Sequence, residues 1–173
     1  MKCLTLSQQS EILRTWGMCE RPYGKEGGPL YYRQFYTPTR FRTLQSFVAV
    51  YLEQFAKEES CLLDVEEWAW YEPYEMELIA AARISEGEER PLFEASGHLF
   101  SPEESDLATA LISLTTAYGW SSYLYVQNSG VILYNWEGDI MDFWSDTKDS
   151  LSTMDELITR YELRSTDAPG DKE

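Results

Sequence analysis

Two stretches of the sequence combine carboxylates with large aromatic rings: "DVEEWAWYEP", residues 64–73, and "YNWEGDIMDFWSD", residues 134–146. Carboxylates attract a cationic partner at long range, and rigid aromatic rings offer large contact areas at short range. This combination is typical of a protein interface, so we predict a surface that binds a basic protein partner. The residues expected to form it are Asp64, Glu66, Trp68, Trp70, Glu72, Trp136, Glu137, Asp139, Asp142 and Trp144.

The first of these stretches also predicts a geometry. If residues 61–71 form a strand, Asp64 and Glu66 share one face with Trp68 and Trp70, because side chains alternate along a strand. The two stretches would make one acidic and aromatic patch if they lie at neighbouring edges of a sheet. In the opposite arrangement the tryptophans pack into the core, the acids face water, and no patch exists.

Catalytic chemistry has weak support in the sequence. His98 is the only histidine, which excludes a metal site or relay that needs two imidazoles from one chain. Ser96 and Ser101 lie near it, but no GxSxG motif accompanies them, and neither Cys19 nor Cys61 forms a recognisable pair with it. We interpret His98 as structural. The alternative, a small enzyme with a carboxylate cleft that includes His98, would be distinguished by metal-dependent thermal stabilisation.

Metal and cofactor motifs were sought among the acids and glycines. The aspartates that follow Gly138 do not have the alternating spacing and final glutamate of an EF-hand loop. Gly24, Gly27 and Gly28 are not followed by the Lys-Ser/Thr of a phosphate-binding loop, and Pro29 interrupts them. The sequence therefore predicts neither a metal site nor a cofactor.

Charge is the strongest feature of the composition. The net charge is −16, and residues 1–42 carry seven bases and three acids, so the acidity lies entirely in the rest of the chain. Such a body repels nucleic acids and acidic membranes at long range and attracts basic partners, so we expect no nucleic-acid or membrane partner. The competing interpretation is a domain without a catalytic role whose charge serves solubility alone.

In this profile the chain resembles bacterial immunity proteins and nuclease inhibitors as a class. Those proteins are small and acidic, lack catalytic motifs, and neutralise basic toxins by occupying them. The resemblance concerns composition only, and it implies a non-enzymatic inhibitor-type protein without assigning a role to any residue.

The remaining composition predicts a cytoplasmic protein. The amino terminus lacks the apolar run of a signal peptide, and no stretch approaches the roughly 18 apolar residues of a membrane span. Cys3, Cys19 and Cys61 are too few and too widely spaced for a disulfide framework, so we expect free thiols. The expected state is a monomer or a small homo-oligomer.

The periodicity of the chain predicts one α+β domain over residues 1–173, with a flexible basic and aromatic segment at about 18–37 and a frayed tail at 165–173. We expect a small, mainly antiparallel sheet with a C-terminal β-hairpin, covered by about five helices. Helices are expected at 6–17, from Thr37-Pro38 to 55, from 73 to 84, from a capping box at Ser101–Glu104 to 118, and at 148–163. Strands are expected at 30–35, 61–71, 91–94, 123–127 and 131–136, with residues 137–146 forming either a strand or a helical turn.

Overall fold

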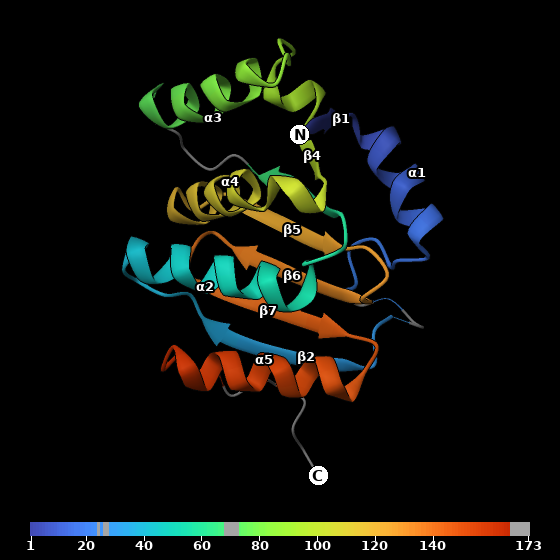
Figure 1. Ribbon diagram of the computed structural model, residues 1–173, viewed down its shortest axis with the longest axis vertical. Coiled ribbons are helices and arrows are strands. Elements are labelled where there is room, and N and C mark those ends of the chain that lie inside the picture. The colour runs from blue at the N-terminus through green and yellow to red at the C-terminus, as the bar shows by residue number, and fades with distance from the viewer. Residues whose placement is uncertain (24, 26–27, 68–72, 167–173) are drawn as a thin grey trace.

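A computed structural model of the chain describes residues 1–23, 25, 28–67 and 73–166. These residues form one seven-stranded antiparallel sheet in the order β1-β4-β3-β5-β6-β7-β2, with helices packed around it (Figure 1). The α+β class predicted from the sequence is thereby confirmed. The strands are β1 (Lys2–Leu4), β2 (Tyr31–Tyr36), β3 (Cys61–Glu67), β4 (Gly97–Phe100), β5 (Ser121–Val126), β6 (Val131–Trp136) and β7 (Ile140–Ser145).

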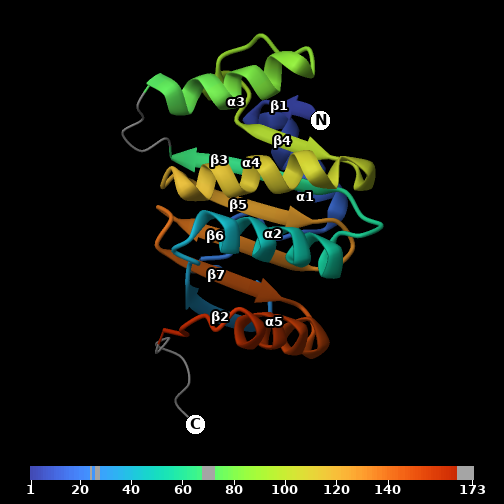
Figure 2. The same cartoon turned by 60° about the vertical axis from the view of Figure 1, so that its left-hand side comes forward.

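The helices cover the two sides of the sheet unequally. In Figures 1 and 2, α2, α4 and α5 lie across one face, and α3 lies beyond the β1–β4 edge. Helix α1 packs against the opposite face through Leu13, Ile12 and Trp16. The helices are α1 (Leu6–Trp16), α2 (Phe41–Phe55), α3 (Pro73–Ser85), α4 (Ser105–Ala117) and α5 (Lys148–Arg160), with short 3-10 turns at Leu92–Glu94 and Pro102–Glu104.

The main core lies between the sheet and the helix layer of α2, α4 and α5. Strand residues such as Leu63 and Val65 of β3 face it, and the apolar stripe of α2 covers them. Phe47, Val48 and Tyr51 in that stripe are almost completely buried, as their spacing predicts. Because β3 alternates, Leu62 and Asp64 point to the opposite face.

Capping residues mark several helix ends, although the box at the start of α1 was not predicted. Thr5 and Gln8 form a reciprocal capping box at the start of α1, and Gly17 ends that helix in the left-handed region. The predicted capping box of Ser101 and Glu104 is present, but it opens a 3-10 turn before α4 begins. The β5–β6 hairpin is confirmed, and residues 140–145 form the strand β7 rather than a helical turn.

Three predictions about local structure were wrong. Helix α2 begins at Phe41 rather than at Thr37, because the Thr37 N–H donates to the Asp139 carbonyl and extends the strand pairing. Residues 92–94 form a 3-10 turn rather than a strand. Strands β1 and β4 were not predicted; they are only three and four residues long and too short to show a period.

Two further expectations concern membranes and cysteines. Within the described residues, every helix is too short or too polar to cross a bilayer. The three cysteines are free thiols; Cys3 and Cys61 are buried, and burial raises the pKa of both.

The turn between β6 and β7 fits closely against the end of α4. Gly138 has φ +81°, and a Cβ there would lie 2.6 Å from the Thr116 carbonyl oxygen. We expect Gly138→Ala to lower the free energy of unfolding by about 2–4 kcal/mol, from backbone strain and this clash together. Gly87→Ala is the matched control, because Gly87 has φ +82° with open space around it and should cost only about 1 kcal/mol. Urea denaturation measures both, and equal losses would contradict the clash.

Candidate functional site

The predicted binding residues that the structure describes gather largely on the sheet face opposite α2, α4 and α5. Strand alternation turns residues of four neighbouring strands toward this side. We call it the acidic-aromatic face and define it by Asp64, Glu66, Tyr123, Tyr125, Tyr134, Trp136, Asp142 and Trp144. The two sequence stretches therefore meet on one side of the sheet.

The two stretches do not occupy neighbouring edges of the sheet, which was one arrangement considered for a single patch. Strands β5 and β6 separate β3 from β7, and their tyrosines fill the interval. The rings of Tyr123 and Tyr134 stack with centroids 4.1 Å apart, and Tyr134 meets Trp136 edge to face at 5.0 Å. A continuous aromatic row thus connects the acids of β3 with Asp142 of β7.

The acidic-aromatic face has two acidic positions, one at Asp64 and Glu66 of β3 and a second centred on Asp142 of β7. The Asp142 carboxylate is fully buried and accepts hydrogen bonds from four side chains, a group that we call the Asp142 cluster. The Tyr23 hydroxyl donates at 2.5 Å and the Gln34 amide at 2.8 Å, and the Tyr32 hydroxyl and Trp136 indole N–H also donate. Gln34 lies directly opposite Asp142 in the β2–β7 pairing, which places its amide within reach.

The donors around Asp142 are neutral. Within the described residues, no lysine or arginine forms an ion pair with this carboxylate, so its charge is held by four dipoles alone. Four donors fit the four acceptor sites of a carboxyl group's two oxygens, and the indole N–H and the amide NH2 can only donate to it. Burial is the largest cause that raises the pKa of Tyr23 and Tyr32, and the hydrogen bond to Asp142 is the second. Both hydroxyls therefore keep their protons.

Asp64 and Glu66 form the first acidic position, and here a cation is present. The Arg21 guanidinium lies 2.7 Å from a Glu66 oxygen and 3.7 Å from an Asp64 oxygen. With its amide oriented so that its oxygen accepts from Ser96 Oγ and the Gly97 N–H, Gln9 donates to the other Asp64 oxygen at 2.8 Å. Burial nevertheless dominates over the lowering effect of Arg21, and it raises the pKa of Asp64 to about 6.

Exposure differs sharply among the predicted residues. Asp64, Asp142 and Trp144 are buried. In contrast, Trp136 is 42% exposed, and its neighbour Tyr23 is 45% exposed. Glu137 and Asp139 are exposed on the β6–β7 turn, next to the face. Trp68, Trp70 and Glu72 lie outside the described residues. Whether the predicted set binds a partner stays a prediction.

Sequence reasoning missed several residues of this site. Tyr23, Tyr32 and Gln34 come from the segment interpreted as flexible, and Gln9 was not connected with the acids. The available signal was the group of tyrosines and bases between residues 21 and 33, which includes Arg21. No local pattern indicates which carboxylate each would reach, because the partners are more than 40 positions apart.

His98 lies away from this face and is fully buried in β4, where its Nε2 lies 3.2 Å from a nitrogen of the Arg83 guanidinium. Arg83 is itself buried and donates to the carbonyls of Ala95 and Arg90. Burial and the neighbouring guanidinium lower the pKa of His98 to about 3, so the ring is neutral at pH 7. A neutral, enclosed imidazole of this kind fits the structural role predicted for it.

Groups of metal-binding side chains and similar proteins were also sought. Across the described part of the chain, no cluster of three or more His, Cys, Asp or Glu side chains is arranged to hold a metal ion. Comparison with protein-family models, with curated proteins and with solved structures returned no match.

Proposed function

We propose that this chain is a non-enzymatic binding protein that captures a basic protein partner on the acidic-aromatic face. The observation that carries the proposal is the Asp142 cluster: a buried carboxylate held only by neutral donors, at the edges of two aromatic residues that are nearly half exposed. A cation placed on the Trp136 or Tyr23 ring gains the attraction of the ring face and of the carboxylate at the ring edge. Water is excluded from that carboxylate, which strengthens the attraction.

The first acidic position supports the same chemistry from within the chain. Arg21 pairs its guanidinium with Glu66, and its backbone N–H donates to the Tyr125 hydroxyl of the aromatic row. Its side chain remains 44% exposed, so the ion pair sits at the surface of the face. Arg21 thus binds at the acidic position formed by Asp64 and Glu66. By analogy, an arginine of a partner would bind at the other acidic position, beside Asp142.

The overall charge supports capture rather than catalysis. A net charge of −16 accelerates the association of a basic partner, and aromatic anchors then limit its dissociation. An inhibitor-type protein of the immunity class needs these two properties and no reacting groups. The enzyme alternative predicts stabilisation by a divalent cation, and a thermal shift with and without Mg²⁺ or Mn²⁺ tests it.

The test is affinity capture from the lysate of the native host at low salt and at about 0.5 M salt, where surface charges are screened. We expect one basic partner whose retention falls with salt. Trp136→Ala should weaken its binding at least about 30-fold, as expected for a central aromatic anchor. Phe93→Ala is the matched control, because Phe93 is an exposed aromatic residue on the 3-10 turn before β4.

Two results would overturn the proposal. The first is a partner whose affinity falls equally with Trp136→Ala and with Phe93→Ala, because this would place the contact elsewhere. The second is the absence of any basic partner at either salt concentration. Charge reversal is best placed at Glu66, whose side chain is partly exposed, because Asp64 is buried and its replacement would also disturb the fold.

A further inference from the structure

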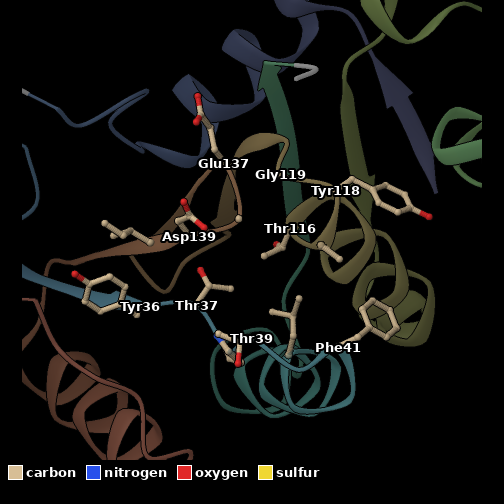
Figure 3. Close-up of a pocket in the computed structure, with 14 residues that line it drawn as sticks. Tyr36, Thr37, Thr39, Phe41, Thr116, Tyr118, Gly119, Glu137 and Asp139 are labelled. Carbon is tan, nitrogen blue, oxygen red and sulfur yellow. The ribbon is translucent and has the colours of Figure 1, made fainter. Parts of the chain in front are cut away.

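A cleft opens at the end of the sheet, separate from the acidic-aromatic face. It lies between the end of β2, the start of α2, the end of α4 and the β6–β7 turn, and its volume is about 940 Å³. This volume suits a small organic ligand. Figure 3 shows Thr37, Thr116 and Asp139 converging on its interior from three different elements.

Two hydroxyl groups on the wall of this cleft lack partners. Thr37 is 8% exposed and Thr116 is 2% exposed, and neither Oγ1 atom has a hydrogen-bond partner among the described residues. A buried polar atom without a partner is costly, and native proteins seldom contain one without a reason. Both oxygens are enclosed, so a molecule in the cleft would reach them only after the threonine side chains rotate toward it, and it would then fill their unused hydrogen-bonding positions.

Charge in the cleft favours a cation. Asp139 supplies an exposed carboxylate, whereas Glu137 contributes to the lining but directs its carboxylate away from the interior (Figure 3). The described lining includes no lysine, arginine or histidine. The negative end of the α4 dipole also reaches the cleft, while the uncapped amino end of α2 opposes it with a similar partial charge. Because these partial charges offset each other, the Asp139 carboxylate sets the sign of the charge within the lining, and the Arg164 guanidinium lies outside the lining on the Tyr36 ring.

The walls between these polar groups are apolar or aromatic. Leu44 and Ile140 contribute to the lining beside Pro38, and Tyr36 stands at its edge. The guanidinium carbon of Arg164 lies 3.9 Å from the centre of the Tyr36 ring, so this edge already accommodates a cationic group. The cleft thus combines acceptors for an ammonium group with surface for an alkyl chain.

We infer that this cleft binds a primary ammonium group carried on an alkyl chain, with Asp139, Thr37 and Thr116 as its acceptors. An ammonium group has three donors and no acceptor, which matches one carboxylate and two hydroxyls. A free alkylamine and a lysine side chain share this chemistry. The inference does not depend on the proposed function, since none of its acceptors belongs to the Asp142 cluster.

Isothermal titration calorimetry with five-carbon probes tests the inference. We expect 1,5-diaminopentane to bind, and we expect neither 1,5-pentanediol nor glutarate to bind, because they replace the ammonium groups by hydroxyls or carboxylates. Capped lysine, N-acetyl-lysine methylamide, distinguishes the sources: binding comparable to that of the diamine indicates a lysine side chain, and much weaker binding indicates a free amine. Equal binding of the diol, or no binding of the diamine, would overturn the inference.

Variants locate the binding. Asp139→Asn should weaken diamine binding at least about 10-fold, the effect of losing a charged hydrogen bond, and Thr116→Val should weaken it about fivefold. Both changes preserve side-chain shape, and Thr116→Ala serves if the valine variant fails to fold. Asp149→Asn is the control, because Asp149 follows the opposite end of β7, and Trp136→Ala tests the acidic-aromatic face. Loss of affinity in either control equal to that in Asp139→Asn would overturn the assignment.

Discussion

Replacement of Asp142 by alanine is expected to lower the free energy of unfolding by about 3–5 kcal/mol, the typical effect of breaking a buried charged network. The variant leaves four donors without their acceptor: the Gln34 amide, the Trp136 indole N–H and the hydroxyls of Tyr23 and Tyr32. Water can reach Tyr23 and Trp136, which are partly exposed, so these two recover part of their hydrogen bonding. Urea denaturation followed by tryptophan fluorescence measures the loss.

Two companion variants make the Asp142 result specific. Asp142→Asn retains one acceptor oxygen and should cost less than Asp142→Ala, because the tyrosine hydroxyls can reorient to accept from its amide. Asp139→Ala removes an exposed aspartate from the same hairpin and should change stability by less than about 0.5 kcal/mol. If Asp142→Ala were as stable as Asp139→Ala, the hydrogen-bond network around Asp142 would not contribute to folding as described.

The periodic elements could be predicted because their signals are local. The apolar positions of α2 recur at helical spacing, and the capping residues of α1 and α4 act within four positions of each helix start. Strands β1 and β4 gave no such signal, since each is stabilised by pairing with distant strands rather than by its own pattern. No strand was therefore predicted around His98, although this residue lies within β4.

The candidate site was predictable in composition but not in arrangement. The abundance of acids near tryptophans was visible in the sequence, and four of the five described strand residues of the set lie on β3 and β7. Both Asp142 and Trp136 were expected at the surface. In the structure Asp142 is enclosed, while Trp136 reaches the surface. An aspartate within a strand is ordinarily expected to face water, and three of the four donors that allow its burial lie more than 100 positions earlier: Tyr32 and Gln34 on β2, and Tyr23 before it.

The pH dependence of stability is expected to contain two opposing contributions from adjacent strands. His98 in β4 has a folded-state pKa of about 3 against an ordinary value of 6.5, owing to burial and to Arg83. The unfolded chain therefore takes up a proton first as the pH falls. Stability due to the neutral ring is nearly complete above pH 7.5 and decreases toward pH 3, by about 2 kcal/mol between pH 6.5 and 4.5.

Asp64 in β3 has the opposite sign. Its folded-state pKa is about 6 against an ordinary value of 3.8, chiefly because burial outweighs the attraction of Arg21. The folded chain here takes up the proton first as the pH falls through 6. The cost of the buried charge is therefore present above pH 6 and is relieved between pH 6 and 4, by about 2–3 kcal/mol.

Single substitutions should separate these two contributions. Asp64→Asn removes the compensating group, so between pH 7 and 4.5 the variant should lose about 2 kcal/mol more stability than the native chain. His98→Gln keeps an acceptor for Arg83 and should instead lose about 3 kcal/mol less than the native chain over the same interval. Urea denaturation of both variants and the native chain at the two pH values gives these differences, and contributions from all other carboxylates cancel in the comparison. Parallel pH profiles for the three proteins would show that neither group is buried in the charge state inferred here. Profiles that diverge in opposite directions would show that acid destabilises the fold through His98 on β4 and stabilises it through Asp64 on β3.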